Sequence, residues 1–486
     1  MKTKLKGLIA LLSAAVLLTV ALVLLITTPD TGGEEEGEYH THGGGSAVSE
    51  SDTPVQLLSR QSDEIDYIVL QNANIDGKFT IKRNSVAGTL EIKELSGVAP
   101  LYSDFIEYVW YYGSEIGANY SLDVKSSGQK LSSFGLEKPI ATLTVHFKDK
   151  TKSVLYVGNE VVQDEGIYFA CFDNFDTVYA VPLHDAILQG AKYFIDYDIL
   201  GLASGEETPV IGRIEIKLPK EKQSIVLEPC SVTDRSDQNY GKDYAITKPH
   251  KAVIDDVNVT SLVTELSNLT AMDIAAVKPT KAEDKKYGFS KDSTEIKLQY
   301  SGVDRTIVCG YKNDSNFYVK ADGSDVIYVL EPSAVPVLAN PTLDVLKSSS
   351  IRTYSIDALS KISVRTQDKL YSFSVERKSL TEDEDDGYFE YRAYKDGTEI
   401  NINYYKELLR VLSNGHIMNS STEKTGKQPV VTVEAEYFDN FKRQSDVIEF
   451  YEAPSRRYLC TVNGTAVGQV TSIWLNSFID TAEKAE

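Results

Sequence analysis

Histidine, cysteine and positive charge are all scarce in this chain of 486 residues. The six histidines form no HExxH or other metalloprotease spacing. The four cysteines are Cys171, Cys230, Cys309 and Cys460, and no two of them lie closer than about 60 positions. That separation excludes the short CxxC spacing of zinc ribbons and thioredoxin-like redox sites. An extracytoplasmic location would permit disulfides, but the spacing leaves open whether any of the four pair.

Acidic residues outnumber basic ones by 71 to 50, which gives a formal net charge of -21. Nucleic acid and anionic lipid head groups would be repelled by this charge, so it argues against both as partners. The chain also lacks the phosphate-binding loop, the GxSxG nucleophile elbow and the GxGxxG dinucleotide motif. The sequence therefore predicts no catalytic residue, no cofactor, no metal ligand and no enzyme activity.

The N-terminus carries the longest uncharged apolar stretch, residues 7–28, which is long enough to cross a hydrocarbon core of about 30 Å. Three lysines in residues 1–6 precede it, and an acidic run follows. Because positive charge stays on the cytoplasmic side, we expect a signal-anchor helix with a cytoplasmic N-terminus and an extracytoplasmic body. A cleaved signal peptide is the alternative, although its apolar region is shorter, about 7–15 residues, and ends in a small-x-small site.

Residues 29–60 are rich in Gly, Glu, Ser and Thr and predict a flexible stalk. His40 and His42 lie in this stalk beside several glutamates, but a stalk without fixed geometry does not predict a metal site. A second acidic stretch, Glu382 to Gly387, resembles a calcium loop because alternate carboxylates precede a glycine. The twelfth position holds Ala393 instead of a bidentate glutamate, so a solvated hairpin tip is expected there.

A cassette of glycines, aromatic residues and strands occurs twice in the chain. Its landmarks in the first copy are Gly135, Gly158 and Tyr168, and in the second Gly288, Gly310 and Tyr318. The intervals are 153, 152 and 150 positions, a constancy that indicates an internal repeat. A third, degraded copy lacks the glycine after its second strand, as terminal repeats often differ.

The chain is too long for one hydrophobic core, and the cassettes divide it into three related units at 61–200, 201–350 and 351–482. Each unit predicts a β-hairpin, one amphipathic helix and an antiparallel β-meander, which is an α+β pattern. The apolar stripes of the expected helices repeat every three or four residues. They are Phe105, Tyr108, Val109 and Tyr112; Leu262, Val263, Leu266 and Leu269; and Tyr405, Leu408, Leu409 and Leu412.

The chain resembles a bacterial family known as domain of unknown function 4340. The resemblance rests on the Gly-Leu-x-x-Pro element from Gly135 to Pro139, the strands ending in Gly158 and Gly310, and the Val-Tyr-x-Val strand from Val178 to Val181. It covers units one and two well and is weaker in unit three. It implies a single-pass membrane protein that accompanies ABC-type export systems related to gliding-motility transporters. The family supplies no catalytic residues to carry over.

Taken together, these features predict a non-enzymatic accessory or scaffold subunit of an ABC-type transport complex, with a permease or other envelope proteins as partners. An anchored binding module for an envelope polymer or peptide is the alternative. It draws on tyrosine-rich stretches, Trp110 to Tyr112 and Tyr388, Tyr391 and Tyr394, whose rings could stack on sugars or simply pack in a core. A third hypothesis, an unrecognised hydrolase, predicts a cluster of acids or a Ser/His pair in a pocket.

Overall fold

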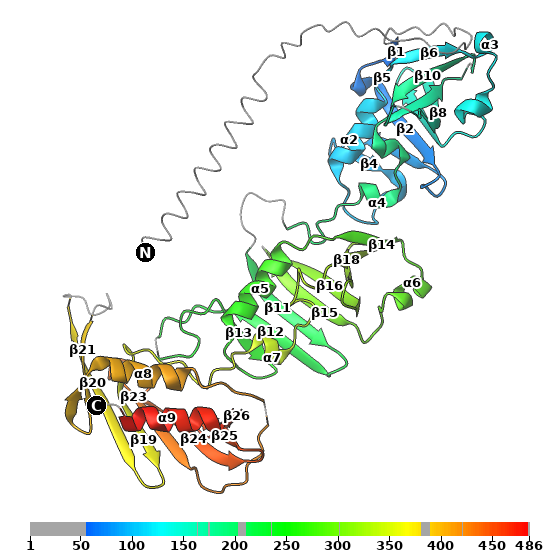
Figure 1. Cartoon of the computed structure of the whole chain (residues 1–486). Helices are drawn as coiled ribbons and strands as arrows, with labels where there is room; N and C mark the ends of the chain where they lie inside the picture. The colour runs from blue at the N-terminus through cyan, green and yellow to red at the C-terminus, as the bar shows by residue number, and fades with distance from the viewer. Residues whose placement is uncertain are drawn as a thin grey trace, which may run out of the picture. The chain divides into compact units, whose positions relative to one another are not determined.

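The computed structural model describes residues 55–484 except 163, 174, 203–209, 235, 301, 381–388 and 420 (Figure 1). The expected cytoplasmic tail, the expected membrane helix at 7–28, nearly all of the stalk and the loop from Glu382 to Gly387 lie outside these residues. Within the described part of the chain, no helix is both long and apolar enough to cross a membrane. The strand pairs there are antiparallel, which confirms an α+β protein built on antiparallel sheets.

The first large sheet has the strand order β4-β3-β2-β7-β8-β9-β10-β6. A separate pair, β1 (Val55–Ser59) and β5 (Glu115–Ala118), forms a small second sheet. The strands of the large sheet are β2 (Ile65–Asn72), β3 (Phe79–Arg83), β4 (Leu90–Ile92), β6 (Tyr120–Asp123), β7 (Ala141–Phe147), β8 (Lys152–Glu160), β9 (Ile167–Cys171) and β10 (Thr177–Pro182). The helices of this unit are η1 (Ser62–Glu64), η2 (Lys93–Leu95), α2 (Ser103–Tyr112), α3 (Val124–Ser127), η3 (Leu131–Phe134), η4 (Asp185–Leu188) and α4 (Ala191–Phe194).

The second large sheet repeats this order as β13-β12-β11-β15-β16-β17-β18-β14. Its strands are β11 (Ile211–Leu218), β12 (Gln223–Pro229), β13 (Tyr244–Lys248), β14 (Asp273–Val277), β15 (Thr294–Tyr300), β16 (Val303–Lys312), β17 (Phe317–Ala321) and β18 (Val326–Leu330). Its helices are α5 (Asp256–Ser267), α6 (Lys281–Lys286) and α7 (Leu343–Leu346). In both sheets a strand that follows the main helix, β6 in the first and β14 in the second, pairs at the far edge with the last strand of the meander, β10 or β18.

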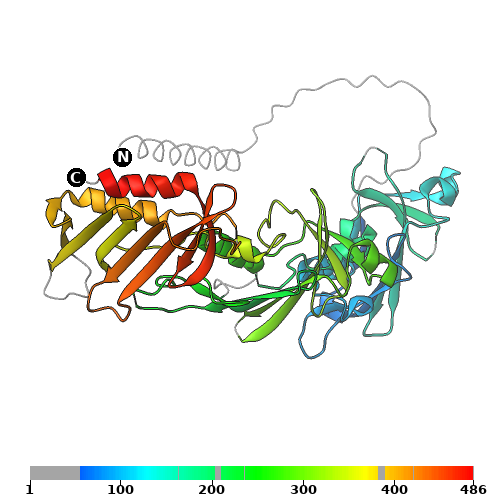
Figure 2. The ribbon, with the colours of Figure 1, turned by 90° about the horizontal axis from the view of Figure 1, so that it is seen from below.

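The third sheet, β22-β21-β20-β19-β23-β24-β25-β26, differs from the other two at both edges. It gains β22, and a single bridge between Asn419 and Gln469 stands where the others have a far-edge strand. Its strands are β19 (Leu359–Thr366), β20 (Leu370–Ser379), β21 (Phe389–Lys395), β22 (Thr398–Ile400), β23 (Val431–Tyr437), β24 (Ser445–Ala453), β25 (Arg457–Val462) and β26 (Thr465–Thr471). Two helices, α8 (Ile402–Ser413) and α9 (Ser472–Lys484), cover the same face of this sheet (Figure 2).

The first two units open with three strands and the third with four, whereas the sequence pattern predicts a two-stranded hairpin in each. The additional strands β4 and β13 have only three and five residues. So few residues give almost no alternation to detect. A register shift also recurs in the opening strand of every sheet, next to the closing pairs Ile65 with Phe147, Ile211 with Tyr300, and Leu359 with Tyr437. A β-bulge bends a strand locally, so the three sheets share a bend as well as an order.

The main helices bury one stripe each against their sheets. In α8 the predicted Tyr405, Leu408, Leu409 and Leu412 are all buried, and α5 buries Leu262 and Leu266. The stripe predicted for α2 is confirmed for Val109, which is buried, and for Phe105 and Tyr112, which pack partly buried against the core, but it is wrong for Tyr108. That helix buries Ile106, Val109 and Trp110, while Tyr108 is 45% exposed. Two tyrosines and a phenylalanine at helical spacing suit either an apolar stripe or an exposed aromatic surface, and the sequence pattern does not separate the two.

Candidate functional site

The cassette glycines meet one another in a backbone packing contact. Gly135 has a φ of 76° and ends the η3 turn, where the amide of Leu136 donates to the carbonyl of Leu131 at 3.0 Å. Gly158 lies in β8 opposite that turn, and a Cβ atom there would stand 2.1 Å from the carbonyl oxygen of Phe134. The first glycine therefore allows the turn, and the second leaves room for its carbonyl.

The second unit builds the same contact. Gly288 has a φ of 85°, and the amide of Phe289 donates to the backbone carbonyl of Asp284 at 2.8 Å. A Cβ on Gly310 would stand 2.4 Å from the carbonyl oxygen of Tyr287. In the third unit, the strand register places Tyr451 where the other two have this glycine. The cassette glycines thus serve the packing of the fold. Unit three has Tyr451 at the position of the second glycine, so it lacks this backbone contact.

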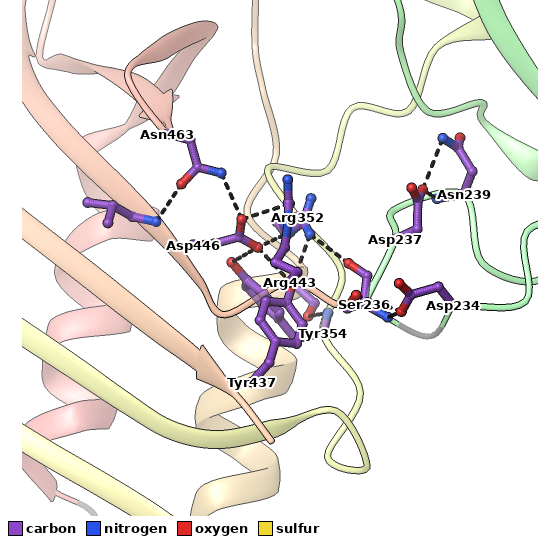
Figure 3. A network of polar contacts seen from close by, with 12 residues as sticks. Asp234, Ser236, Asp237, Asn239, Arg352, Tyr354, Tyr437, Arg443, Asp446 and Asn463 are labelled. Atoms are coloured by element: carbon purple, nitrogen blue, oxygen red, sulfur yellow. Dashed lines mark hydrogen bonds and ion pairs between the residues drawn. The ribbon is translucent and has the colours of Figure 1, made fainter. Parts of the chain in front are cut away.

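The most deeply buried ionic group of the described chain lies in the third unit, around Arg352 and Asp446 (Figure 3). Arg352 Nε is 2.6 Å from Asp446 Oδ2, and the two side chains are 1% and 0% exposed. The hydroxyl of Tyr437 donates to the same oxygen at 2.7 Å, and that of Tyr354 lies 3.4 Å from it. Arg352 Nη2 in turn donates to the Tyr437 oxygen at 2.8 Å.

The other carboxylate oxygen of Asp446 is also occupied. Arg443 Nη1 and Asn463 Nδ2 each donate to Oδ1 at 2.8 Å. Asn463 is itself oriented by the amide of Val447, which donates to its Oδ1 at 2.8 Å. With two guanidinium groups and three neutral donors around it, this carboxylate is fully engaged as an acceptor. Its geometry suits holding structure together and leaves no position for accepting a proton from a substrate.

The two tyrosines remain proton donors at neutral pH. Burial raises the pKa of Tyr437 to about 12, and burial followed by the charge of Asp446 raises the pKa of Tyr354 well above its ordinary value. Neither phenol would ionise to become a nucleophile near pH 7.

The chain builds a related arginine clamp in the first unit. Arg60 precedes β2 as Arg352 precedes β19, and its guanidinium carbon lies 4.4 Å from the ring centre of Phe147. Phe147 and Tyr437 occupy the same register position, next to the bulge. Arg60 Nη2 pairs with Asp149 Oδ2 at 2.8 Å, but these side chains are 30% and 47% exposed. The recurring arginine before the opening strand is the sequence signal that could have located Arg352.

A loop of the second unit completes the Arg352 group. Arg352 Nη2 donates to the carbonyl oxygen of Ser236 at 3.1 Å, and Ser236 is 3% exposed. Ser236 lies between β12 and β13, in residues 230–243, and Figure 3 shows this loop approaching the network. Arg352 Nε contacts Asp446 as an ion pair without a hydrogen bond of good geometry, and Arg352 Nη1 is buried with no hydrogen-bond partner among the described residues. The network therefore fastens the start of unit three to a loop of unit two.

Cavities surround this loop. One of about 580 Å³ is lined by Asp234 and Tyr240 from the loop and by Arg377, Phe441 and Lys442 from the third unit. Arg377 is already held there, because it donates to Asp357 O at 2.6 Å and to Asn440 Oδ1 at 2.7 Å. Its guanidinium also lies 4.1 Å from the ring centre of Phe438. This cavity brings together aromatic and charged side chains but no nucleophile with an adjacent base among the described residues.

A further cavity of about 400 Å³ is lined by His250, Ser348 and Ser350, the residue types that the hydrolase hypothesis requires. The amide of Ser350 donates to Ser348 Oγ at 3.2 Å, and no hydrogen bond between described residues joins His250 to either serine. Nor does the described part of the chain group three metal-ligating side chains. His40 and His42 and the acidic loop from Glu382 lie outside it.

The predicted aromatic groups are dispersed. Trp110 is buried, and its Nε1 donates to the carbonyl of Ser62 at 3.1 Å, which is a core role. Tyr391 donates to Asp357, and Tyr394 donates to Glu376 Oε2 at 3.1 Å. Tyr388 falls outside the described residues. All four cysteines are free, with Cys171, Cys309 and Cys460 buried and Cys230 partly exposed.

Comparison with known families gives one match, to the family described as Domain of unknown function (DUF4340), over residues 116–243 and 245–429. These ranges cover more than half of the chain. The chain belongs to this family. The matched ranges take in most of the first two DUF4340 sheets, with both cassettes, and continue into the third as far as the segment before β23. No curated protein and no solved structure matches the chain.

Proposed function

We propose that this DUF4340 protein is a single-pass, extracytoplasmic and non-enzymatic accessory or scaffold subunit of an ABC-type membrane transport complex. The uncharged stretch at 7–28 supplies the anchor, and the acidic body that follows is repelled by anionic lipid. The transport association rests on the family resemblance.

The joints between units carry the proposal. Val98 and Ile195 of the first unit belong to the hydrophobic cluster of the second, and Lys278 Nζ donates to the carbonyl of Glu94 at 2.8 Å. The second joint is the buried bond from Arg352 to Ser236. Joints with buried contacts restrict domain motion. A chain of sheets held in this way supports a role in positioning partners.

The test is affinity purification of the full-length tagged chain from crosslinked, detergent-solubilised membranes. We expect permease and ATPase subunits of one transporter to be recovered, and we expect the chain itself to resist extraction by alkaline carbonate. Recovery of no transporter subunit from repeated crosslinked preparations would refute the accessory role, and release by carbonate would refute the anchor.

The alternative function, an anchored binding module for an envelope polymer or peptide, draws support from the exposed rings of α2. Retention of the full-length chain on isolated cell wall, with no transporter subunit recovered, would favour it.

A further inference from the structure

The first unit exposes a connected surface of aromatic rings around α2. We call the side chains of Tyr102, Phe105, Tyr108, His184 and Tyr193 the α2 ring surface. Tyr102 and Tyr108 are 42% and 45% exposed, and the other three are partly buried. Tyrosine is enriched at protein interfaces, because it combines a large apolar ring with a polar hydroxyl.

The rings are in direct contact. The ring centres of Tyr102 and Phe105 are 4.5 Å apart, and Phe105 stacks on Tyr193 at 4.4 Å. Phe105 lies 6.2 Å from Tyr108, which lies 4.6 Å from His184. These contacts join α2 to η4 and α4, so the rings are held on three packed elements. A surface fixed in this way needs little ordering when a partner binds.

Three carboxylates without an ion pair among the described residues border these rings, and Asp104 Oδ1 accepts only from Ser103 Oγ, at 3.3 Å. Asp104 and Glu107 are exposed on α2, one helical turn apart and within four residues of Tyr108. Asp185 is exposed beside His184, and it lies close enough to Tyr193 that burial and then the charge of Asp185 raise the pKa of that phenol. None of the three carboxylates forms an ion pair with a described basic residue, and Lys192 is the exposed cation on α4.

Ring faces and carboxylates together favour a cationic ligand. The face of an aromatic ring attracts cations, and arginine is the cation that most often stacks there. A carboxylate adds a charge-assisted hydrogen bond to the same guanidinium. A polyanion would be repelled by the three acids, and a purely apolar helix would leave them unsatisfied.

We propose that the α2 ring surface binds an arginine- or lysine-rich peptide segment of a partner protein. The proposal deepens the accessory role, because it assigns the partner contact of such a subunit to α2. A neutral glycan is the competing occupant, since sugars also stack on tyrosine.

The experiment measures fluorescence anisotropy of a labelled eight-residue peptide of alternating arginine and glycine, titrated with the full-length chain in neutral detergent. Tyr108→Ser should weaken binding about two- to fivefold, the loss expected for one exposed cation–π contact. The double variant Asp104→Asn and Glu107→Gln should weaken it by at least as much, and 0.5 M NaCl should reduce the difference between variants because it screens surface charge.

Two matched controls separate this surface from the general acidity of the protein. Tyr404→Ser removes a tyrosine that is 45% exposed on α8, and the double variant Asp314→Asn and Glu390→Gln removes the same charge from exposed positions elsewhere. Both controls should bind the arginine peptide like the unmodified chain. Melting curves of all variants report folding, which exposed substitutions should leave unchanged.

If the site and control variants weakened peptide binding equally, the proposal would be overturned, because binding would then depend on the net charge of the protein and not on the α2 ring surface. Binding of chitohexaose in place of the peptide, lost in Tyr108→Ser, would overturn it in favour of a glycan. Failure here combined with recovery of transporter subunits would reject this surface alone. Peptide binding without transporter recovery would reject the accessory role and keep the surface.

Discussion

Replacing Arg352 by methionine tests whether the buried network holds the third unit together. Methionine fills much of the same volume but removes the charge 2.6 Å from Asp446 and the donor to Ser236. Breaking a buried ion pair by removing one partner costs about 3–5 kcal/mol. Arg443, Asn463 and the two phenols still donate to the carboxylate, so we expect the lower end, about 3 kcal/mol.

Arg60→Met is the matched control for this variant. Arg60 makes a similar clamp before the opening strand of the first unit, with an acid and a ring, but its ion pair is partly exposed to water. Water screens such a pair, and exposed ion pairs often contribute nothing measurable. We therefore expect no resolvable change in the first unit. The two variants differ mainly in burial.

Native-state hydrogen exchange is the suitable assay, because a chain of several units has no single unfolding free energy. A loss of about 3 kcal/mol corresponds to exchange faster by roughly a hundredfold in the least protected cooperative unit. We expect this change in peptides from β19, β23 and β24 of Arg352→Met and none in peptides from β2 and β7 of Arg60→Met. Unchanged exchange in the third unit, or equal changes in both variants, would refute the assignment.

The remaining predictions concern the cassette and the thiols. Gly158→Ala and Gly310→Ala should each destabilise their own unit by about 1–3 kcal/mol in thermal melts, because the new methyl group overlaps a carbonyl, whereas Gly117→Ala, with its nearest atom 3.9 Å away, should not. At pH 8 a thiol reagent should modify Cys230 alone in the native chain and all four cysteines after denaturation; rapid modification of Cys309 would contradict its burial. Burial raises the pKa of the Cys171 and Cys309 thiols from 9.0 to about 12 in the folded chain. Because the unfolded chain loses these protons first, the stability that the protonated thiols contribute is complete below pH 9.0 and is lost as the pH rises through 12. Thermal melts at alkaline pH would measure this loss.

The sequence predicted the parts of the fold that are periodic. The stripe from Tyr405 to Leu412 faces the core because leucines at three- and four-residue steps lie on one side of a helix, and burying that side removes their apolar surface from water. In α2 the same spacing includes tyrosine and phenylalanine, which are also stable at a surface, and the hydrophobic pattern alone wrongly placed Tyr108 in the core. The short strands β4 and β13 were not predicted, because three to five residues are too few to show the alternation of apolar and polar residues that marks a strand.

The buried network could not be predicted by composition or spacing. Asp446 stands in β24, a strand whose alternation looks ordinary, and its partners come from four places in the sequence. Only the fold brings Arg352, Tyr437 and Asn463 around one carboxylate. Arg60 with Phe147 offered a hint, since an arginine precedes the opening strand in both units, but such a pair acquires meaning only once the register shows that Phe147 and Tyr437 are equivalent.

The two clamps indicate where the units have diverged. Both contain an arginine, an aromatic residue beside the bulge and an acid, although the register places Asp446 at the position of Ser153 and not of Asp149. Only the clamp of unit three is buried, and there the arginine donates to the carbonyl of Ser236. An ion pair in water contributes little to stability. When a loop excludes water, the low dielectric strengthens the attraction between the two charges, and removing one partner leaves the other charge buried and unpaired, which is costly. The bond from Arg352 to Ser236 thus makes the clamp of unit three a joint to the loop at 230–243. The α2 ring surface is also a feature of one unit. Its helix α2 is the main helix of unit one, as α5 and α8 are in units two and three, and the rings of Phe105 and Tyr108 contact each other on it. Residues that all units share account for the fold, and residues that one unit alone has altered are the ones to test for partners.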